Sequence, residues 1–220
     1  LYNMIKGILH IFIERKDDFI TYFLQHLYLI SIALAFILSI GLILGVVMTY
    51  HKKIATFILT VTGFLYTIPS IAMFGFLIYI TGIGNQSAII AITIYGMLPM
   101  IRNTYVGLKE VDPNIIEAAT GMGSTEMQLL FRVKFPLAFP VIMAGFRTTV
   151  VMTVALGGIA AFIGGGGLGI PIWRGISSYN QELIFAGSLL VALLAITLDL
   201  LLQLFDMFIK RKLYGRGGQK

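Results

Sequence analysis

Residues 54–101 read IATFILTVTGFLYTIPSIAMFGFLIYITGIGNQSAIIAITIYGMLPMI and contain no Asp, Glu, Lys or Arg. A helix needs about 20 mostly apolar residues to cross the hydrocarbon core of a bilayer, so this stretch is long enough for two crossings. Further uncharged runs cover residues 19–50, 148–173 and 183–198. Only 12% of the 220 residues are charged, against about 25% in a soluble domain. The sequence therefore predicts an all-α membrane protein.

The apolar runs predict five spanning helices with breaks at prolines. We place the spans at residues 27–50, 54–80, 88–101, 140–163 and 184–209, and we expect the third to start nearer Ile83. Pro69 lies inside the second predicted span and Pro99 near the end of the third. Each proline removes one backbone donor and predicts a kink. Such kinks line transport paths in some membrane proteins, and in others they only serve helix packing.

Basic residues predict the orientation of the spans, because cytoplasmic loops carry an excess of Lys and Arg. With the N-terminus outside, eleven Lys and Arg residues fall inside and four outside, leaving Arg147 within a span uncounted. We therefore expect N-out, C-in topology. Residues 1–26 then form an extracytoplasmic amphipathic segment, residues 27–209 the membrane domain, and residues 210–220 a basic cytoplasmic tail.

The longest predicted cytoplasmic loop, residues 102–136, contains signals for two short helices. Asp112 followed by Pro113 predicts a helix start, since Asp caps a first turn and Pro fits its first position. Gly121 and Gly123 are expected to break that helix. Thr125 and Gln128 have capping-box spacing for a second helix. We expect this second helix to carry Met127, Leu130, Phe131 and Lys134 near one face and to stop at Pro136.

One pattern in this loop resembles the EAA loop of ABC importer permeases. It consists of Glu117-Ala118-Ala119, then Gly123, then Val133-Lys134-Phe135-Pro136; the family pattern ends in Ile-x-Leu-Pro, so Val133 and Phe135 are conservative departures. The resemblance implies that the loop docks into a separate ATP-binding subunit. The implied coupling residues are Glu117, Ala118, Ala119, Gly121, Gly123 and Pro136.

Further motifs resemble one branch of these permeases, the importers of glycine betaine, carnitine and choline. The motifs are Thr67-Ile68-Pro69-Ser70, Tyr95-Gly96-Met97-Leu98-Pro99, Ala144-Gly145-Phe146-Arg147-Thr148 and the run from Ile163 to Gly169. The resemblance implies a type I ABC importer fold in the bacterial plasma membrane and a role in osmoprotectant uptake. It also implies a second permease subunit, identical or homologous, two ATPase subunits that bind ATP and Mg, and an extracytoplasmic substrate-binding protein, which we expect to be a separate chain. We expect no cofactor in this chain, because it contains no Gly-Lys dipeptide and so no P-loop.

Two charged residues are expected deep within spans. Arg147 and Asp199 both lie in the cytoplasmic third of their predicted helices, where a charge costs about 3 kcal/mol on insertion scales. We hypothesise that they pair, or that each holds a broken helix end, near an inner gate. The alternative is that Arg147 extends to the interface and Asp199 faces water.

The run Gly164–Gly169 contains five glycines in six residues, which cannot continue a stable helix. The chain must turn or re-enter the membrane there. Gly165 and Gly167 are therefore candidates for an outer gate, or simply for a tight turn. Trp173 is expected to anchor at the membrane interface, and the scattered His10, His26 and His51 have no metal-site spacing.

Other functions fit the sequence less well. The basic residues lie in loops between spans, so they do not indicate nucleic acid as a partner. An intramembrane enzyme would need facing carboxylates, a Ser/His constellation or metal ligands, and none is indicated. A passive channel subunit explains the spans but not the loop pattern. Among importers, the alternatives are permeases for another small zwitterion, an amino acid such as methionine, or a thiol-betaine.

Overall fold

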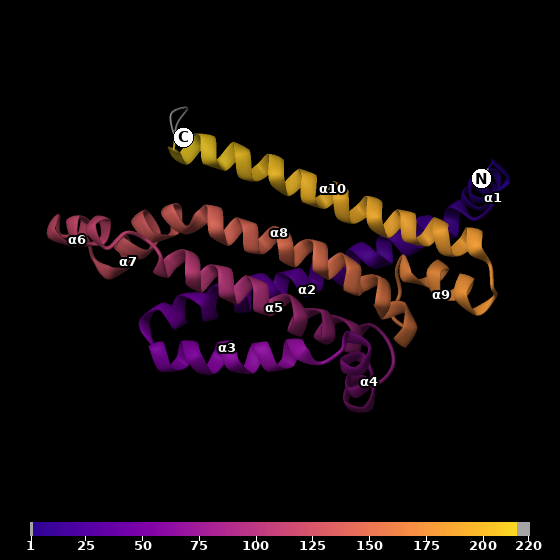
Figure 1. Ribbon diagram of the computed structural model, residues 1–220, viewed down its shortest axis with the longest axis horizontal. Helices are drawn as coiled ribbons and strands as arrows, with labels where there is room; N and C mark the ends of the chain where they lie inside the picture. The colour runs from indigo at the N-terminus through magenta and orange to yellow at the C-terminus, as the bar shows by residue number, and fades with distance from the viewer. Residues whose placement is uncertain (1, 215–220) are drawn as a thin grey trace.

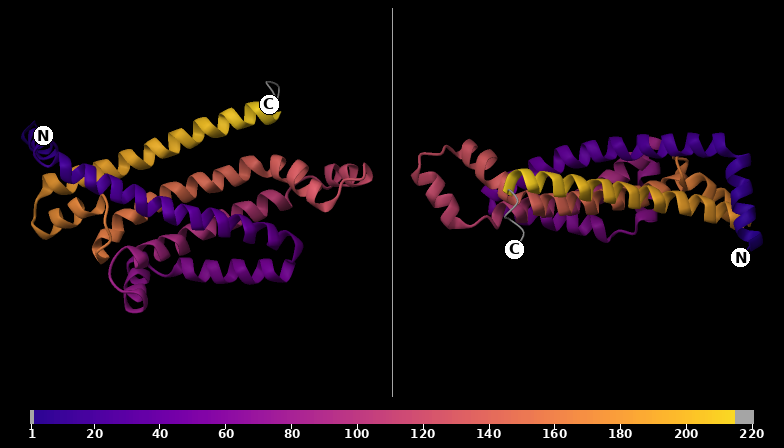
Figure 2. Two further views of the ribbon diagram at one scale, coloured as in Figure 1. Left: turned by 180° about the vertical axis from the view of Figure 1, so that it is seen from behind. Right: turned by 90° about the horizontal axis from the view of Figure 1, so that it is seen from above.

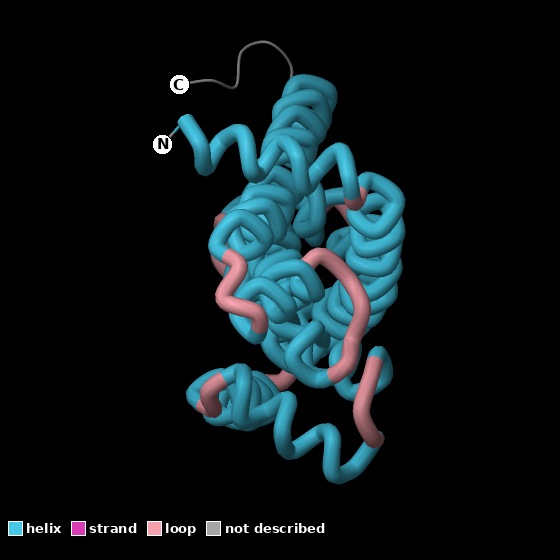
Figure 3. Tube along the Cα trace, turned by 90° about the vertical axis from the view of Figure 1, so that its right-hand side faces the viewer, coloured by secondary structure: helices cyan, strands magenta, loops and turns pink. Residues whose placement is uncertain are grey.

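The computed structural model describes residues 2–214, and the side chains of residues 6–212. Every regular element in that part of the chain is helical (Figure 3). In chain order the elements are α1 (Tyr2–Glu14), α2 (Lys16–Tyr50), α3 (Lys52–Thr67), α4 (Ser70–Thr81), α5 (Asn85–Lys109), α6 (Pro113–Gly121), α7 (Glu126–Gln128), the π-helix η1 (Leu129–Lys134), α8 (Phe135–Ala160), the 3-10 turn η2 (Ala161–Ile163), α9 (Gly169–Ser177) and α10 (Gln181–Tyr214).

Four long helices, α2, α5, α8 and α10, run along the length of the molecule (Figure 1). The short helices α6 and α7 project from one end, here called the loop end (Figures 1 and 2). Helices α1 and α9 lie at the opposite end, here called the glycine-turn end. Four helical stretches are long and apolar enough to cross a membrane, and the pair α3 and α4 makes a fifth if counted as one broken span. The all-α class is confirmed, while the number and direction of the spans stay predictions.

The second predicted span is broken rather than kinked. Helix α3 ends at Thr67, α4 begins at Ser70, and the two axes meet at 99°. Pro69 lies at the break, and both Ile68 and Pro69 have extended backbone angles. A proline disfavours helical geometry in the residue before it and donates no hydrogen bond, so α3 cannot continue through this point. Pro99, in contrast, lies inside α5, which continues to Lys109.

Several helix boundaries differ from those expected. Helix α2 begins at Lys16 rather than residue 27, so the predicted N-terminal segment is not one element. Helix α5 extends to Lys109, so the loop between spans starts eight residues later than residue 102. Helix α10 continues to Tyr214 and takes in the first part of the predicted basic tail; residues 215–220 lie outside the described residues.

Helix α1 packs its apolar face against the glycine-turn end of α10 and α2. Ile8 is buried with Phe19 of α2 and Leu183 of α10, and the Phe12 and Phe19 rings lie 5.0 Å apart. The chain bends between α1 and α2 at Arg15. Burial of apolar side chains therefore fixes this segment to the bundle, in addition to any contact with a membrane surface.

Small residues bring the central helices close together. A Cβ atom at Gly41 or Gly45 of α2 would overlap Met100 or Thr104 of α5, and one at Gly145 of α8 would overlap Asn103 of α5. Membrane helices pack mainly through close van der Waals contact, and small residues permit it. Helix α5 is thereby held between α2 and α8, and the largest buried cluster lies along these three helices and α4.

Candidate functional site

The loop helix α6 begins as its sequence predicts. The Asp112 carboxylate oxygen Oδ1 accepts hydrogen bonds from the backbone N–H of Asn114 at 2.9 Å and from its side-chain amide at 3.0 Å. Pro113 occupies the first turn, where no backbone donor is needed. None of the α6 residues is buried. Helix α6 is therefore well capped but makes no packing core of its own, which is typical of a surface that meets another protein.

The end of α6 depends on one glycine rather than two. Gly123 has φ +85°, and its N–H donates to the Thr120 carbonyl at 2.9 Å. The Ser124 N–H reaches back to the carbonyl of Ala119 at 3.1 Å. This left-handed cap is the usual way for a helix to end at glycine. Gly121, expected to help break the helix, is its last helical residue instead.

The second loop helix has the predicted capping box but not the predicted end. Thr125 Oγ1 accepts from the Gln128 N–H at 3.3 Å, and Gln128 Oε1 accepts from the Thr125 N–H at 3.0 Å. The prediction that Pro136 stops this helix is wrong. The chain widens into η1, where the Phe135 N–H bonds to the Leu130 carbonyl, and continues through Pro136 into α8. The wider turn accommodates the proline that an ordinary helix would not.

This continuity makes α7 and η1 an extension of α8, whereas α6 is joined to them through the turn at residues 122–125. Leu129 and Leu130 are buried, whereas Met127 and Phe131 are exposed, so the residues expected near one face differ in their burial. The exposed apolar residues of the loop instead form what we call the loop surface, which comprises Ile115, Met122, Met127 and Phe131. The implied coupling residues Glu117 and Ala118 are also exposed on α6, and Ala119 is half-buried.

Arg147 of α8 and Asp199 of α10 form the pair that the sequence suggests. Nε of Arg147 donates to Oδ1 of Asp199 and Nη2 donates to Oδ2, both at 2.9 Å. Among the described side chains this is the only ion pair that joins two helices. Both side chains are about one-third exposed, at 28% and 34%. They line a groove of about 570 Å³, here called the ion-pair groove, with Thr148 and Met152 among its other residues.

A second groove, here called the α5 groove, has a volume of about 620 Å³. Its lining residues are Tyr66 of α3, then Leu98, Pro99, Arg102, Asn103 and Val106 of α5, with Glu110 just beyond the end of that helix. The Tyr66 hydroxyl donates to Met152 Sδ of α8 at 3.5 Å, and the Tyr66 ring lies 5.8 Å from that of Tyr95. Since Met152 lines the ion-pair groove, this contact joins one residue of each groove.

The glycine turn is held by side chains from two other helices. The backbone N–H groups of Gly166, Gly167 and Leu168 donate to Asn85 Oδ1, Gln25 Oε1 and His26 Nδ1, at 3.3, 3.1 and 3.3 Å respectively. Gly167 has φ +104°, and a Cβ atom at Gly165 would lie 2.8 Å from the Ala160 carbonyl oxygen. The turn therefore requires glycine at both candidate positions, and it leads into the short helix α9, which was not expected.

His26 of α2 holds part of the structure together, although the sequence analysis does not single it out. Its side chain is fully buried and faces α8. Since Nδ1 accepts from Leu168, Nε2 carries the proton and donates to the Val154 carbonyl at 3.2 Å. The ring thus connects the glycine turn to the middle of α8. Its position within an otherwise uncharged run was the available signal.

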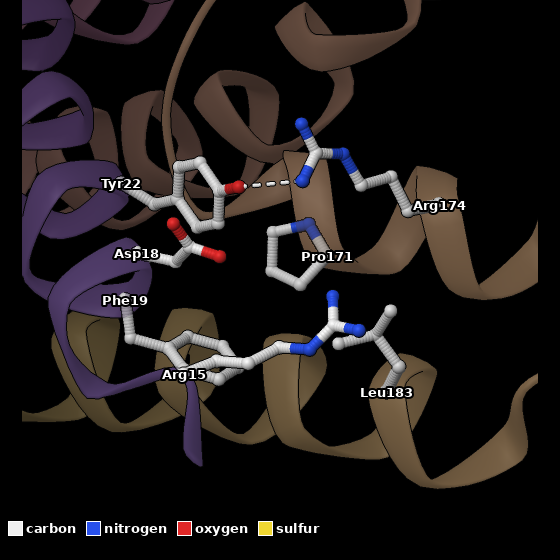
Figure 4. A pocket seen from close by; sticks show the side chains of 7 residues that line it. All are labelled: Arg15, Asp18, Phe19, Tyr22, Pro171, Arg174 and Leu183. Atoms are coloured by element: carbon white, nitrogen blue, oxygen red, sulfur yellow. Dashed lines mark hydrogen bonds between the residues drawn. The ribbon is translucent and has the colours of Figure 1, made fainter. Parts of the chain in front are cut away.

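Two arginines gather at the glycine-turn end (Figure 4). Arg15 and Arg174 line a groove with Asp18 and Tyr22, and Arg174 Nη1 donates to the Tyr22 hydroxyl at 2.8 Å. Trp173 lies nearby with its ring 4.7 Å from that of Phe162. No group of His, Cys, Asp or Glu suited to a metal ion occurs within the described part of the chain.

A comparison of the sequence with known protein families identifies the family to which the chain belongs. The family described as "Binding-protein-dependent transport system inner membrane component" matches residues 37–213. The chain belongs to this family. The match begins midway along α2 and covers the loop, both ion-pair residues and the glycine turn. This chain is thus a membrane permease of a bacterial transport system.

Curated relatives narrow the family. The permease is 45% identical over 77% of its length to the ergothioneine transport permease/ergothioneine binding protein EgtU of Helicobacter pylori, but it spans only 31% of that protein. It is 39% identical over 81% of its length to a glycine betaine/carnitine/choline transport system permease of Bacillus subtilis, and covers 82% of that chain. The osmoprotectant branch expected from the sequence is therefore among its close relatives.

A solved structure supports the fold. The permease superposes on a chain of the MetNI methionine ABC transporter in an inward-facing conformation with a TM-score of 0.75. The two are 25% identical, and the superposition covers 89% of the permease and 95% of that chain. The type I ABC importer fold predicted from the sequence is confirmed.

Proposed function

We propose that this permease carries quaternary-ammonium osmoprotectants such as glycine betaine, carnitine and choline into the bacterial cell, driven by a separate ATPase. The proposed coupling to the ATPase rests on one observation: the exposed loop helix α7 continues through η1 into α8. The substrate part rests on the relatives that transport these compounds.

The assembly that we propose contains two permease chains, identical or homologous, two ATPase subunits that bind ATP and Mg, and an extracytoplasmic substrate-binding protein. The loop end faces the cytoplasm and the glycine-turn end faces outward, as the excess of Lys and Arg near the loop end favours. The loop surface of Ile115, Met122, Met127 and Phe131 supplies apolar anchors for the ATPase. ATP hydrolysis belongs to that partner and not to this chain.

In the proposed mechanism α8 acts as the lever. ATP-driven closure of the two ATPases moves α6, and the turn at Gly123 passes this motion to α7. The unbroken helical path from α7 through η1 then passes it to α8. The Arg147–Asp199 pair then carries α10 with α8. His26 transmits the position of α8 to the glycine turn at the outer end. Such coupled motion opens the path alternately to each side.

The test is reconstitution of the permease in proteoliposomes with its ATPase and binding protein. We expect uptake of glycine betaine that requires ATP, the ATPase and the binding protein. Uptake down a gradient without ATP would indicate a passive channel and overturn the proposal.

Ergothioneine is a second candidate substrate because the relative with 45% identity is named for it. It too carries a trimethylammonium group and a carboxylate. Uptake of each labelled compound separates the candidates. An osmoprotectant importer takes up labelled glycine betaine, and an equal concentration of unlabelled ergothioneine does not compete with it. An ergothioneine importer takes up labelled ergothioneine, and an equal concentration of unlabelled glycine betaine does not compete with it.

A further inference from the structure

The α5 groove combines one aromatic side chain with one unpaired guanidinium. Tyr66 lies against Tyr95 on one side and contacts Met152 through its hydroxyl, yet 45% of its surface stays exposed. Its orientation is thus set by two contacts while its ring remains available. A ring held in this way attracts a cation to its face, and a quaternary ammonium is well suited because it is weakly hydrated.

One arginine lines each groove, Arg147 the ion-pair groove and Arg102 the α5 groove, and only Arg102 is free to bind a ligand. Arg147 already makes two hydrogen bonds to Asp199. Arg102 is exposed and forms no ion pair or hydrogen bond with any side chain described in the structure. Glu110, the one acidic residue in the groove lining, follows Arg102 by eight residues, about 12 Å along a helix axis. An unpaired guanidinium at the edge of a groove can donate two parallel hydrogen bonds to a carboxylate.

The two groups lie at a separation that suits a small zwitterion. Tyr66 contacts α5 at Tyr95, and Arg102 follows Tyr95 by seven residues, about 10 Å along the helix. Side chains on a helix lean toward its N-terminus, so the guanidinium reaches back toward the Tyr66 level and shortens that distance. Leu98 and Pro99 line the apolar floor between them.

We propose that the α5 groove is a substrate subsite in the transport path, where Tyr66 receives the trimethylammonium group and Arg102 the carboxylate of a zwitterionic osmoprotectant. This subsite rests on the proposed function and adds a selectivity to it. Choline has the ammonium but no carboxylate, so it uses Tyr66 alone. The groove volume of about 620 Å³ accommodates either compound with water.

The experiment measures uptake of glycine betaine and of choline by the reconstituted transporter at saturating substrate. Arg102→Gln is expected to lower glycine betaine uptake at least about tenfold, the loss typical of a hydrogen bond to a charged group, and to leave choline uptake unchanged or higher. Tyr66→Leu lowers uptake of both, and Tyr66→Phe restores most of it. Lys109→Gln removes the same charge from α5 outside the groove and leaves both substrates at the wild-type rate.

Three outcomes overturn the subsite. If Arg102→Gln lowers uptake of both substrates equally, or of neither, the guanidinium does not bind the substrate carboxylate. Loss of the purified complex in that variant assigns the groove to contact with the second permease. If the wild-type transporter takes up neither compound, the proposed function and the subsite are both overturned. If the wild type takes up both and Arg102→Gln changes the two uptake rates equally, the subsite alone is overturned.

Discussion

At the scale of single residues, the ion pair between α8 and α10 has the clearest energetic consequence. A lone charge within a membrane-spanning helix costs about 3 kcal/mol, and the partner's two hydrogen bonds offset that cost. Because both side chains are about one-third exposed, the net value of the pair is smaller than for a dry site. Removal of one partner is therefore more harmful than removal of both.

We expect Arg147→Gln and Asp199→Asn each to lower the unfolding temperature of the detergent-solubilised permease and its uptake rate. Each leaves one charge in the span unpaired, at a cost of about 1–3 kcal/mol. The double exchange Arg147→Asp with Asp199→Arg restores part of both properties. Arg211→Gln, which removes an exposed arginine of α10 that makes no ion pair among the described side chains, is the matched control and has a small effect. An exchange that rescues neither property contradicts the pairing role.

His26 allows a second residue-scale prediction, because its two nitrogens make different bonds. His26→Ala leaves the buried Leu168 N–H without its partner, which costs about 1–3 kcal/mol, and removes the extra hydrogen bond to the Val154 carbonyl, which keeps its bond within α8. His26→Asn retains an acceptor near the Nδ1 position and is expected to recover part of the loss. Thermal unfolding measures both variants, with the exposed His51→Ala as control. If His26→Ala unfolds at the wild-type temperature, the ring does not hold the glycine turn.

At the scale of elements, the sequence predicts features that depend on neighbouring residues, whereas most features that depend on distant residues are not predicted. The Asp112 cap and the Thr125 capping box depend on neighbouring residues only, and both are present. The helix stop expected at Pro136 fails because η1 widens the backbone, which a proline pattern does not reveal. Burial of His26 and the existence of α9 depend on contacts between residues more than 120 positions apart. The pairing of Arg147 and Asp199 is an exception, because their similar depths within the predicted spans indicated it.

The junction between α6 and α7 gives the element-scale prediction. Gly123→Leu places a branched side chain at φ +85°, a region that non-glycine residues rarely adopt, at a cost of about 1–2 kcal/mol. We expect α6 to shift, so that ATP hydrolysis continues while substrate uptake falls at least several-fold. Gly63→Ala, in helical geometry within α3 with open space around it, keeps both activities. Parallel assays of hydrolysis and uptake check this, and normal coupling in Gly123→Leu counts against the lever.

At the scale of the whole molecule, the direction of the bundle in the membrane is open to a simple labelling test. The chain contains no cysteine, so single introduced thiols report their own accessibility. Lys53→Cys, an exposed position near the start of α3 that is predicted to be cytoplasmic, is expected to react with a membrane-impermeant maleimide only after the cells are opened. Ser177→Cys at the glycine-turn end reacts in intact cells. The reverse pattern contradicts the N-out, C-in orientation.

The central claim is that the loop, continuous with α8, is where a separate ATPase drives this permease. The most direct measurement is photo-crosslinking from a benzophenone attached at position 122, the most exposed apolar residue of the loop surface. The account predicts a crosslink to an ATP-binding subunit that changes in yield when ATP is added, and none from the same probe at position 177. Absence of that crosslink in a complex that still performs ATP-driven uptake would contradict it.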